Sequence, residues 1–304
     1  MENLLEISSL FLQQLVNGIT LGGVYALIAV GYTMVYGVIQ LINFAHGEIY
    51  MFGAFLAFAM VTVFNVPFVL AAVLSVVICA CFGILLDFVA YRPLRNAPRL
   101  AALITAIGMS LFLQNLALMI WGGEIQSFPR EVLPPVFYRP AISFGDVIVT
   151  WLQIVILSVT VVFMAMLHFI IHRTAVGTAM RAISQDKTTA ALMGINVNRV
   201  ISFTFAIGSS MGAVAGILVG LYYNAIFHFM GYIMGLKAFA AAVLGGIGSV
   251  PGAMLGGGLL GIAEALGAGY LSSAYRDGIS YGVMILIIIF KPSGLIGRDT
   301  TERA

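Results

Sequence analysis

Long apolar stretches dominate this chain, and short polar joints separate them. The apolar stretches cover residues 12–39, 47–64, 67–90, 100–121, 147–171, 200–224, 236–270 and 278–290. A helix needs roughly 20 apolar residues to cross a hydrocarbon core about 30 Å thick. The pattern therefore predicts an all-α polytopic membrane protein with about eight to ten transmembrane segments and a single membrane domain over residues 1–304.

Composition agrees with this class. Of the 304 residues, 61% are hydrophobic and only 9% are charged, against roughly 25% charged in a soluble domain, which excludes an ordinary globular enzyme. The chain starts with Glu2 and Glu6 and lacks the basic region of a secretory signal, so we expect the first apolar segment to be retained. The net charge of +2 forms no continuous basic stripe, so membrane lipid is a predicted partner and nucleic acid is not.

Basic residues concentrate in two of the polar joints. Cytoplasmic joints of membrane proteins carry an excess of Lys and Arg, so both joints are predicted to be cytoplasmic. The proline-containing loop 122–146 between them is then predicted to be a periplasmic, irregular connection, and the N-terminus to lie outside. The basic residues are Arg92, Arg95 and Arg99 in the first joint and Arg173, Arg181, Lys187 and Arg199 in the second.

Glycine interrupts two long apolar stretches, one in each half of the chain. The stretch 236–270 is too long for one untilted span, so we expect two half-helices or a re-entrant turn near Gly248 to Gly252. The stretch from Asn17 to Glu48 has the same character. Paired broken helices that meet near the bilayer midplane are typical of internally repeated transporters. The predicted breaks are at Gly47, Gly245, Gly246, Gly248, Pro251 and Gly252.

A few polar residues fall within or beside the apolar stretches. They are costly in hydrocarbon unless they face protein or water, which makes them candidates for a translocation pathway. A zwitterionic substrate could place its carboxylate at the start of a half-helix and its ammonium group against carbonyls or a carboxylate. Helix capping beside Gly47, and pairing of Glu264 within the bundle, are the alternatives. The candidates are Asn43, His46, Glu48, Lys237 and Glu264.

The sequence offers no evident metal, cofactor or ATP site. Cys79 and Cys81 are two residues apart, which puts them on different faces of a helix. The histidines lack acidic or Cys partners at metal-ligand spacing. No lysine follows a Gly-rich turn as a P-loop requires. We therefore expect no metal, no cofactor and no catalytic residue on this chain, and any ATP hydrolysis to take place on partner chains.

The joint at 172–199 is too polar to cross a membrane and too ordered in composition for a disordered linker. Residues Arg181 to Met193 are predicted to form one helix that ends at Gly194, a common C-terminal cap. The small apolar surface of this helix, beside charged residues, favours docking in a groove on another protein. A helix that lies on the membrane surface is the alternative.

Several strings resemble one family over essentially the whole chain. They are NGITLGGVYALIAVGYTMVYGVIQLINFAHGEIYM at Asn17 to Met51, AIGMSLFLQN at Ala106 to Asn115, KAFAAAVLGGIGSVPGAMLGG at Lys237 to Gly257, and GIAEAL at Gly261 to Leu266. Together with the 172–199 segment, they resemble the LivH-type permease subunit of branched-chain amino-acid ABC importers of the bacterial inner membrane.

The resemblance implies a set of partners and a role for the polar joint. The partners would be a second related permease subunit, two cytoplasmic ABC ATPase subunits, a substrate-binding protein and the amino-acid substrate. The joint would couple to the ATPases through Arg181, Asp186, Lys187, Gly194, Ile195 and Asn196. Gln185 departs from the acidic residue expected before Asp186, which would alter contacts with the ATPase.

Other functions are compatible with parts of this pattern. The same superfamily includes permeases for urea and short amides, and more distantly for ribose-type sugars, so the resemblance is more specific for fold than for substrate. An ion-coupled secondary transporter and a pore for a small neutral solute are further alternatives. Neither has an evident need for the polar coupling segment.

Overall fold

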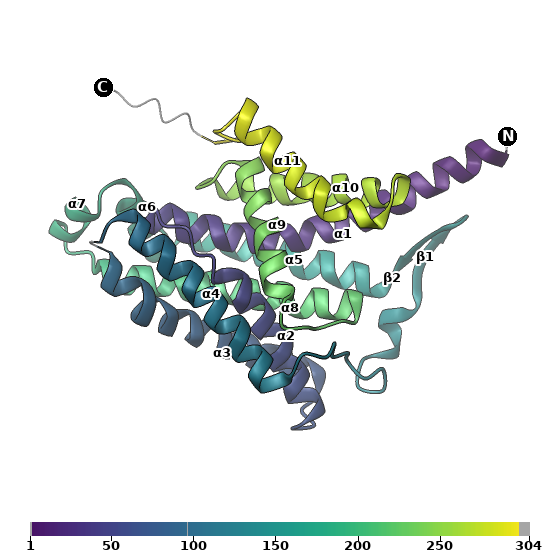
Figure 1. Ribbon diagram of the computed structural model, residues 1–304, viewed down its shortest axis with the longest axis horizontal. Helices are drawn as coiled ribbons and strands as arrows, with labels where there is room; N and C mark the ends of the chain where they lie inside the picture. The colour runs from purple at the N-terminus through teal and green to yellow at the C-terminus, as the bar shows by residue number, and fades with distance from the viewer. Residues whose placement is uncertain (1, 96, 298–304) are drawn as a thin grey trace.

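Apolar helices make up most of the computed structural model, which describes residues 2–95 and 97–297 (Figure 1). Seven helices of the described chain are long and apolar enough to cross a membrane, and two shorter apolar helices, α2 and α9, accompany them. The predicted all-α polytopic class is confirmed. The apolar helices are α1 (Glu2–Ile39), α2 (His46–Thr62), α3 (Phe68–Leu86), α4 (Arg99–Trp121), α5 (Trp151–Arg173), α8 (Val197–Tyr223), α9 (Met230–Gly245), α10 (Val250–Tyr270) and α11 (Arg276–Phe290).

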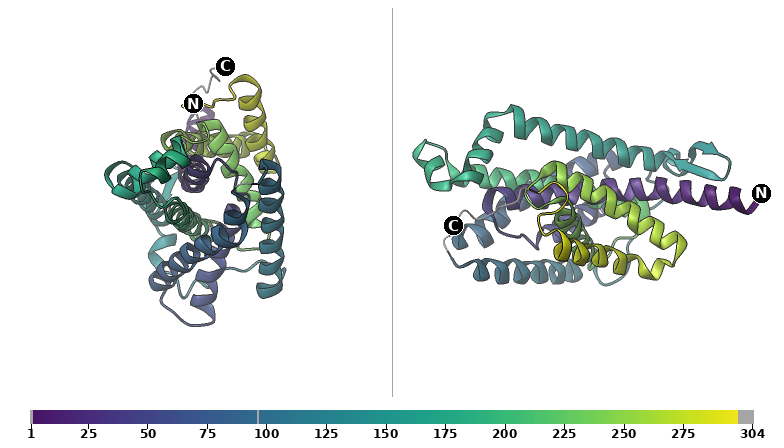
Figure 2. Two further views of the ribbon diagram at one scale, coloured as in Figure 1. Left: turned by 90° about the vertical axis from the view of Figure 1, so that its left-hand side faces the viewer. Right: turned by 90° about the horizontal axis from the view of Figure 1, so that it is seen from above.

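The two ends of the bundle differ in structure. Two short helices, α6 (Ala175–Gln185) and α7 (Lys187–Leu192), project at one end together with the Arg-rich joints. At the other end lies an antiparallel hairpin of β1 (Pro140–Phe144) and β2 (Val147–Thr150), near the start of α1. Helices α1 and α5 run along the long axis between these ends, as the right-hand view of Figure 2 shows.

The loop between α4 and α5 is more regular than the sequence predicts. Residues 141–144 include isoleucine and phenylalanine at alternate positions, and residues 147–150 are all β-branched, as is typical of strands. Gly145 has a positive φ of 59°, so a tight Gly-Asp turn joins the two strands. The hairpin is held to α1 by Gln13, whose side-chain oxygen accepts a hydrogen bond from the Ile148 amide at 2.8 Å. The prolines that predict an irregular connection precede the hairpin, at positions 129, 134 and 135, or start it, at 140.

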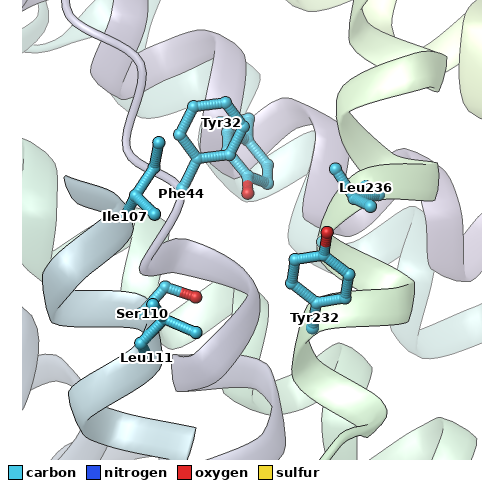
Figure 3. Close-up of a pocket in the computed structure, with 8 residues that line it drawn as sticks. Tyr32, Phe44, Ile107, Ser110, Leu111, Tyr232 and Leu236 are labelled. Atoms are coloured by element: carbon cyan, nitrogen blue, oxygen red, sulfur yellow. The ribbon is translucent and has the colours of Figure 1, made fainter. Parts of the chain in front are cut away.

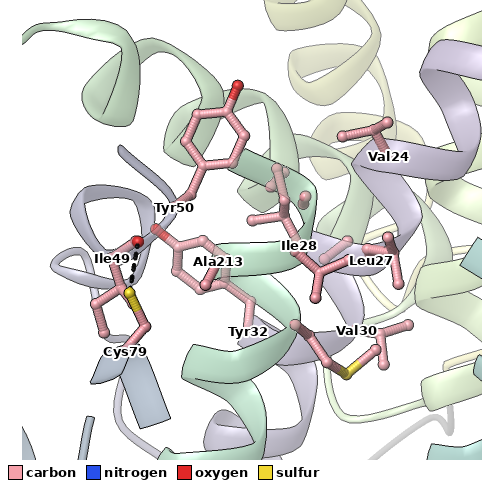
Figure 4. Packing of buried hydrophobic residues seen from close by; sticks show 14 of the residues in the cluster. Val24, Leu27, Ile28, Val30, Tyr32, Ile49, Tyr50, Cys79 and Ala213 are labelled. Carbon is pink, nitrogen blue, oxygen red and sulfur yellow. Dashed lines mark hydrogen bonds between the residues drawn. The ribbon is translucent and has the colours of Figure 1, made fainter. Parts of the chain in front are cut away.

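The core of the bundle is built around α1 and α8, which are mostly buried, whereas α3, α4, α5 and α11 expose most of their apolar side chains. Figure 4 shows α1 residues such as Leu27 and Ile28 packed against α2 and α8. In a bilayer the hydrophobic effect does not drive apolar helices together, so their association depends on close packing. Small residues allow the helix backbones to approach closely. A Cβ atom on Gly261 of α10 would lie only 2.2 Å from the Gly22 amide nitrogen of α1. These two helices therefore pack backbone to backbone.

The first discontinuity separates α1 from α2. Helix α1 ends at Ile39, Gln40 has a positive φ of 57°, and residues 40–45 are not helical. The His46 ring at the start of α2 packs edge-on against the Tyr32 ring, with centroids 4.8 Å apart. Tyr32 lies seven residues before the end of α1, which is about 10 Å along a helix. The helix α2 therefore begins within the thickness of the bundle.

The second discontinuity separates α8 from α9. Asn224 ends α8 with a positive φ of 49°, and α9 begins at Met230. The start of α9 lies against the start of α2, because a Cβ atom on Gly47 would be 2.4 Å from the Gly231 carbonyl oxygen. We call this meeting of His46–Glu48 with Met230–Gly235 the junction. Two short helices thus begin side by side inside the bundle.

The glycine-rich stretch 236–270 forms a helical hairpin. Gly246 and Gly248 have positive φ values of 106° and 94° and lie in the turn between α9 and α10. Gly245 is the last residue of α9, while Pro251 and Gly252 lie in the first turn of α10. The chain reverses direction at this turn, and the amide of Ile296 bonds to the Gly245 carbonyl at 3.0 Å. The residues after α11 therefore return to the end that carries α6 and α7.

Candidate functional site

A small cavity lies beside the junction, between α1, the α1–α2 connection, α4 and α9 (Figure 3). Its volume is about 170 Å³, below the roughly 300–1,000 Å³ of drug-sized sites, which suits a small solute. The walls are mainly apolar, with three hydroxyl groups among them. The lining residues are Tyr32, Phe44, Ile107, Ser110, Leu111, Tyr232, Gly235 and Leu236.

A second cavity flanks the same two short helices. It measures about 320 Å³ and is lined by Tyr50 of α2, Tyr223 of α8 and apolar residues of α8, α9 and the segment between them. Tyr50 follows Glu48 by two residues, and its buried hydroxyl has no hydrogen-bond partner among the described residues. We call this the outer cavity, because it involves the α8–α9 connection, which pairs with the α4–α5 loop through the bridge between Gln126 and Ile226.

Three predicted pathway residues keep polar atoms without hydrogen-bond partners among the described residues: His46 and Glu48 at the junction, and Asn43 just before it. Glu48 is fully buried, and its Oε1 atom accepts a hydrogen bond from the Ser110 hydroxyl at 2.8 Å. Its Oε2 atom has no partner among the described residues. Asn43 accepts a hydrogen bond from the Tyr91 hydroxyl at 2.6 Å, while its amide nitrogen is unpaired within the described chain. Buried polar atoms without partners are uncommon and call for an explanation.

The predicted residues Lys237 and Glu264 lie elsewhere, in a compact ion-pair cluster with Arg276 and Asp277. Lys237 contacts Glu264 at 3.0 Å and Asp277 at 2.7 Å. Glu264 also receives hydrogen bonds from the hydroxyls of Tyr25, at 3.0 Å, and Ser280, at 2.8 Å. Both carboxylate oxygens are therefore occupied by protein groups. The cluster joins α1, α9, α10 and α11. This arrangement matches the alternative given above for Glu264, which is pairing with other residues within the bundle.

The polar joint differs from its predicted form, because two helices replace one. Asp186 has an extended backbone, with φ −153° and ψ 114°, so the predicted helix from Arg181 to Met193 is interrupted there. Its carboxylate caps α7 by accepting a hydrogen bond from the Thr188 amide at 2.8 Å. The Thr189 hydroxyl and the amides of Thr188 and Thr189 hold the pKa of Asp186 below its ordinary value.

The remaining residues of the joint fix its ends. Gly194 has a positive φ of 84° just after α7, as a C-terminal cap requires. Asn196 caps α8, since its side-chain oxygen accepts a hydrogen bond from the Arg199 amide at 3.1 Å. The Arg181 guanidinium donates to the carbonyl of Ile171 near the end of α5. The Ile195 amide bonds to Ala190 at 3.1 Å.

Lys187 connects this joint to the first discontinuity. Its ammonium group donates to the carbonyl of Ile39, the last residue of α1, at 3.1 Å. Burial and the nearby Arg95 guanidinium lower the pKa of Lys187. Arg95 is itself paired with the buried carboxylate of Asp87 at 2.6 Å, and the Ser202 hydroxyl bonds to the same carboxylate at 2.7 Å. The joint is thereby tied to the end of α1, while Asp87, just after α3, links Arg95 to Ser202 of α8.

Sequence reasoning missed several residues that shape the cavity. Ser110 gives no signal by itself, because a serine inside an apolar helix is common and its partner is 62 positions away. Gly231 and Gly235 were absent from the predicted breaks, although they let α9 approach α2. The bond from Ser110 to Glu48, and the close packing of Gly231 and Gly235 against the start of α2, are evident only in the folded structure.

A bundle of apolar helices with cavities at two inner helix starts is the architecture of a membrane transport protein. The family model described as the branched-chain amino acid transport system / permease component matches residues 14–288. The chain therefore belongs to this permease family, and the predicted family is confirmed.

Curated relatives match over nearly the full length of both chains. The chain is 46% identical to the high-affinity branched-chain amino acid transport system permease protein BraD of Pseudomonas aeruginosa, over 96% of this chain and 98% of that protein. It is 46% identical to the permease protein LivH of Escherichia coli K12, over 96% and 97% respectively. A probable LivH of Methanocaldococcus jannaschii is 28% identical over 90% of this chain and 88% of that protein.

Proposed function

We propose that this chain is the membrane-spanning permease subunit of an ATP-driven importer for branched-chain amino acids, in the inner membrane. The named activity of relatives that are 46% identical over almost the whole chain supports this substrate class. The two cavities at the junction supply room for a small, largely apolar solute. Transport by a protein without a P-loop then depends on partners that hydrolyse ATP.

The partner set follows from this proposal. Two ATPase subunits dock on the cytoplasmic side, a second related permease subunit or a second copy completes the pathway, and a binding protein delivers substrate on the opposite side. The end that carries α6, α7 and the Arg-rich joints is the cytoplasmic end, by the excess of basic residues. The β1–β2 hairpin is then on the periplasmic side.

The contact between Lys187 and the Ile39 carbonyl is the observation that best supports coupling. Displacement of α7 by an ATPase acts directly on the end of α1, and α2 begins only seven residues after Ile39, with Glu48 in its first turn. ATP binding favours one permease conformation through its differential affinity for the two states. The joint at 172–199 is thus the coupling segment, and the junction is the part of the pathway that it moves.

The test is the ATPase activity of the complete complex with its binding protein. Binding protein loaded with leucine, isoleucine or valine is expected to stimulate ATP hydrolysis, whereas urea and ribose are not. Lys187→Met is expected to leave ATP hydrolysis active but to reduce leucine uptake per ATP. Stimulation by urea and not by leucine would contradict the substrate class, and wild-type uptake per ATP in Lys187→Met would contradict the coupling route.

A further inference from the structure

Two buried carboxyl groups lie within this bundle, and their surroundings are opposite. Glu264 is surrounded by two cations and two hydroxyl groups, which occupy both of its oxygen atoms. Glu48 is equally buried, but Ser110 is its one hydrogen-bond partner among the described residues, and no Lys or Arg of the described chain forms an ion pair with it. A buried carboxylate is stable only when it is paired. Within the described chain, Glu48 therefore lacks the protein cations that neutralise Glu264.

Ser110 links Glu48 to the cavity. Its hydroxyl donates its single proton to Glu48 and also lines the cavity, where Figure 3 shows the oxygen directed toward the open space facing Tyr232. A hydroxyl group whose proton is engaged can only accept further hydrogen bonds. The polar wall of the cavity therefore presents an acceptor with a carboxyl group directly behind it. An ammonium group, with three donors and no acceptor, matches this arrangement.

The helix starts at the junction favour the ionised form of Glu48. Helix N-termini carry a partial positive charge that stabilises nearby anions. Glu48 is the third residue of α2, and its Oε2 atom lies near the start of α9, since a Cβ atom on Gly231 would be 2.4 Å away. Both helix starts therefore place partial positive charge beside Glu48, which favours its ionised form over the neutral acid.

Apart from the hydroxyl groups of Ser110, Tyr32 and Tyr232, the side chains that line the cavity are apolar. Phe44, Ile107, Leu111 and Leu236 contribute aromatic and branched aliphatic surface, which binds a hydrocarbon side chain by removing it from water. We propose that this cavity is a binding site for the substrate on the permease itself, in which Ser110 and Glu48 recognise the ammonium group and the apolar walls hold the side chain. The inference rests on the proposed function and deepens it, because selection then occurs in the membrane as well as in the binding protein.

The test follows protection of an introduced thiol in the complete transporter. Leu111→Cys places the thiol at the cavity, and Ile104→Cys on the same helix, also exposed but outside the lining, is the matched control. Cys79 and Cys81 are replaced by alanine in both. Labelling by a small thiol reagent is measured with leucine, with 3-methylbutylamine, which lacks the carboxylate, and with 4-methylpentanoate, which lacks the amino group.

Leucine and 3-methylbutylamine are expected to slow labelling of Leu111→Cys, and 4-methylpentanoate is not. Labelling of Ile104→Cys is expected to be the same with all three. Glu48→Gln is expected to raise the half-protecting leucine concentration at least about tenfold, equivalent to about 1.4 kcal/mol. Equal protection by 4-methylpentanoate, undiminished protection in Glu48→Gln, or no labelling of Leu111→Cys in any condition would overturn the site.

Two controls separate this result from others. The comparison of the three ligands uses no change at Glu48, so it decides the question even if Glu48→Gln does not assemble, and Ser110→Ala is the second variant, with a smaller expected loss. Leucine uptake is measured on the same liposomes. Uptake without protection contradicts the site alone, and protection without ATP-dependent uptake contradicts the proposed function alone.

Discussion

The junction between α2 and α9 depends on the absence of a side chain at Gly47. A Cβ atom there would lie 2.4 Å from the Gly231 carbonyl oxygen and 2.8 Å from the Gly235 Cα atom, and both are backbone atoms that cannot rotate away. Ordinary contact begins near 3.4 Å, so Gly47→Ala must separate the two helices by about 1 Å, the difference between 3.4 and 2.4 Å. Overpacking of this kind costs about 1–3 kcal/mol. Gly47→Ala is therefore expected to lower stability and to displace the adjacent Glu48.

Gly108→Ala is the matched control for this prediction. Gly108 lies within α4 and a Cβ atom there would meet no heavy atom within 4 Å, so alanine is expected to stabilise the helix by roughly 0.5–1 kcal/mol. The same substitution thus has opposite signs at the two positions. The assay is the thermal unfolding midpoint in detergent, followed by leucine uptake in liposomes. A midpoint and an uptake equal to wild type in Gly47→Ala would refute the close approach of α2 and α9.

Three further predictions follow from the ion pairs and caps. Glu264→Gln leaves Lys237 paired only with the half-exposed Asp277 and is expected to lower the thermal unfolding midpoint of the bundle; a midpoint near wild type would contradict the structural role. Lys187→Arg keeps a donor near the Ile39 carbonyl and is expected to retain more uptake per ATP than Lys187→Met, so equal values would count against this contact. Asp186→Asn preserves the cap of α7 and is expected to couple ATP hydrolysis to uptake, whereas Asp186→Ala is not; equal coupling in both would show that the cap has no role.

The sequence predicts the helical class and the positions of the glycine turn well, because both are local properties. Apolar stretches of membrane-crossing length define the helices, and Gly246 and Gly248 have the positive φ values that glycine favours. The start of α9 was not predictable in the same way. The hydrophobic pattern predicts an apolar stretch that begins at residue 236, because Gly231, Tyr232 and Gly235 interrupt the pattern before it, whereas α9 begins at Met230.

The site was only partly predictable for a related reason. Glu48 and Glu264 look alike in the sequence, since each is an acidic residue in or beside an apolar stretch. Their difference comes from tertiary neighbours: Lys237 and Ser280 satisfy Glu264, while Ser110 alone reaches Glu48 among the described residues. Asp186 was placed inside a helix because the residues around it favour helix, and its competing capping interaction appears only in three dimensions.

Leucine uptake by liposomes that contain the complete complex tests the central claim most directly. The permease is reconstituted with its partner permease, ATPases and binding protein, and uptake is measured with ATP in the absence of ion gradients, and with imposed proton or sodium gradients in the absence of ATP. We predict uptake of leucine with ATP alone and none with gradients alone. Uptake that follows an ion gradient and needs no ATP would contradict the assignment of this chain as an ABC importer subunit.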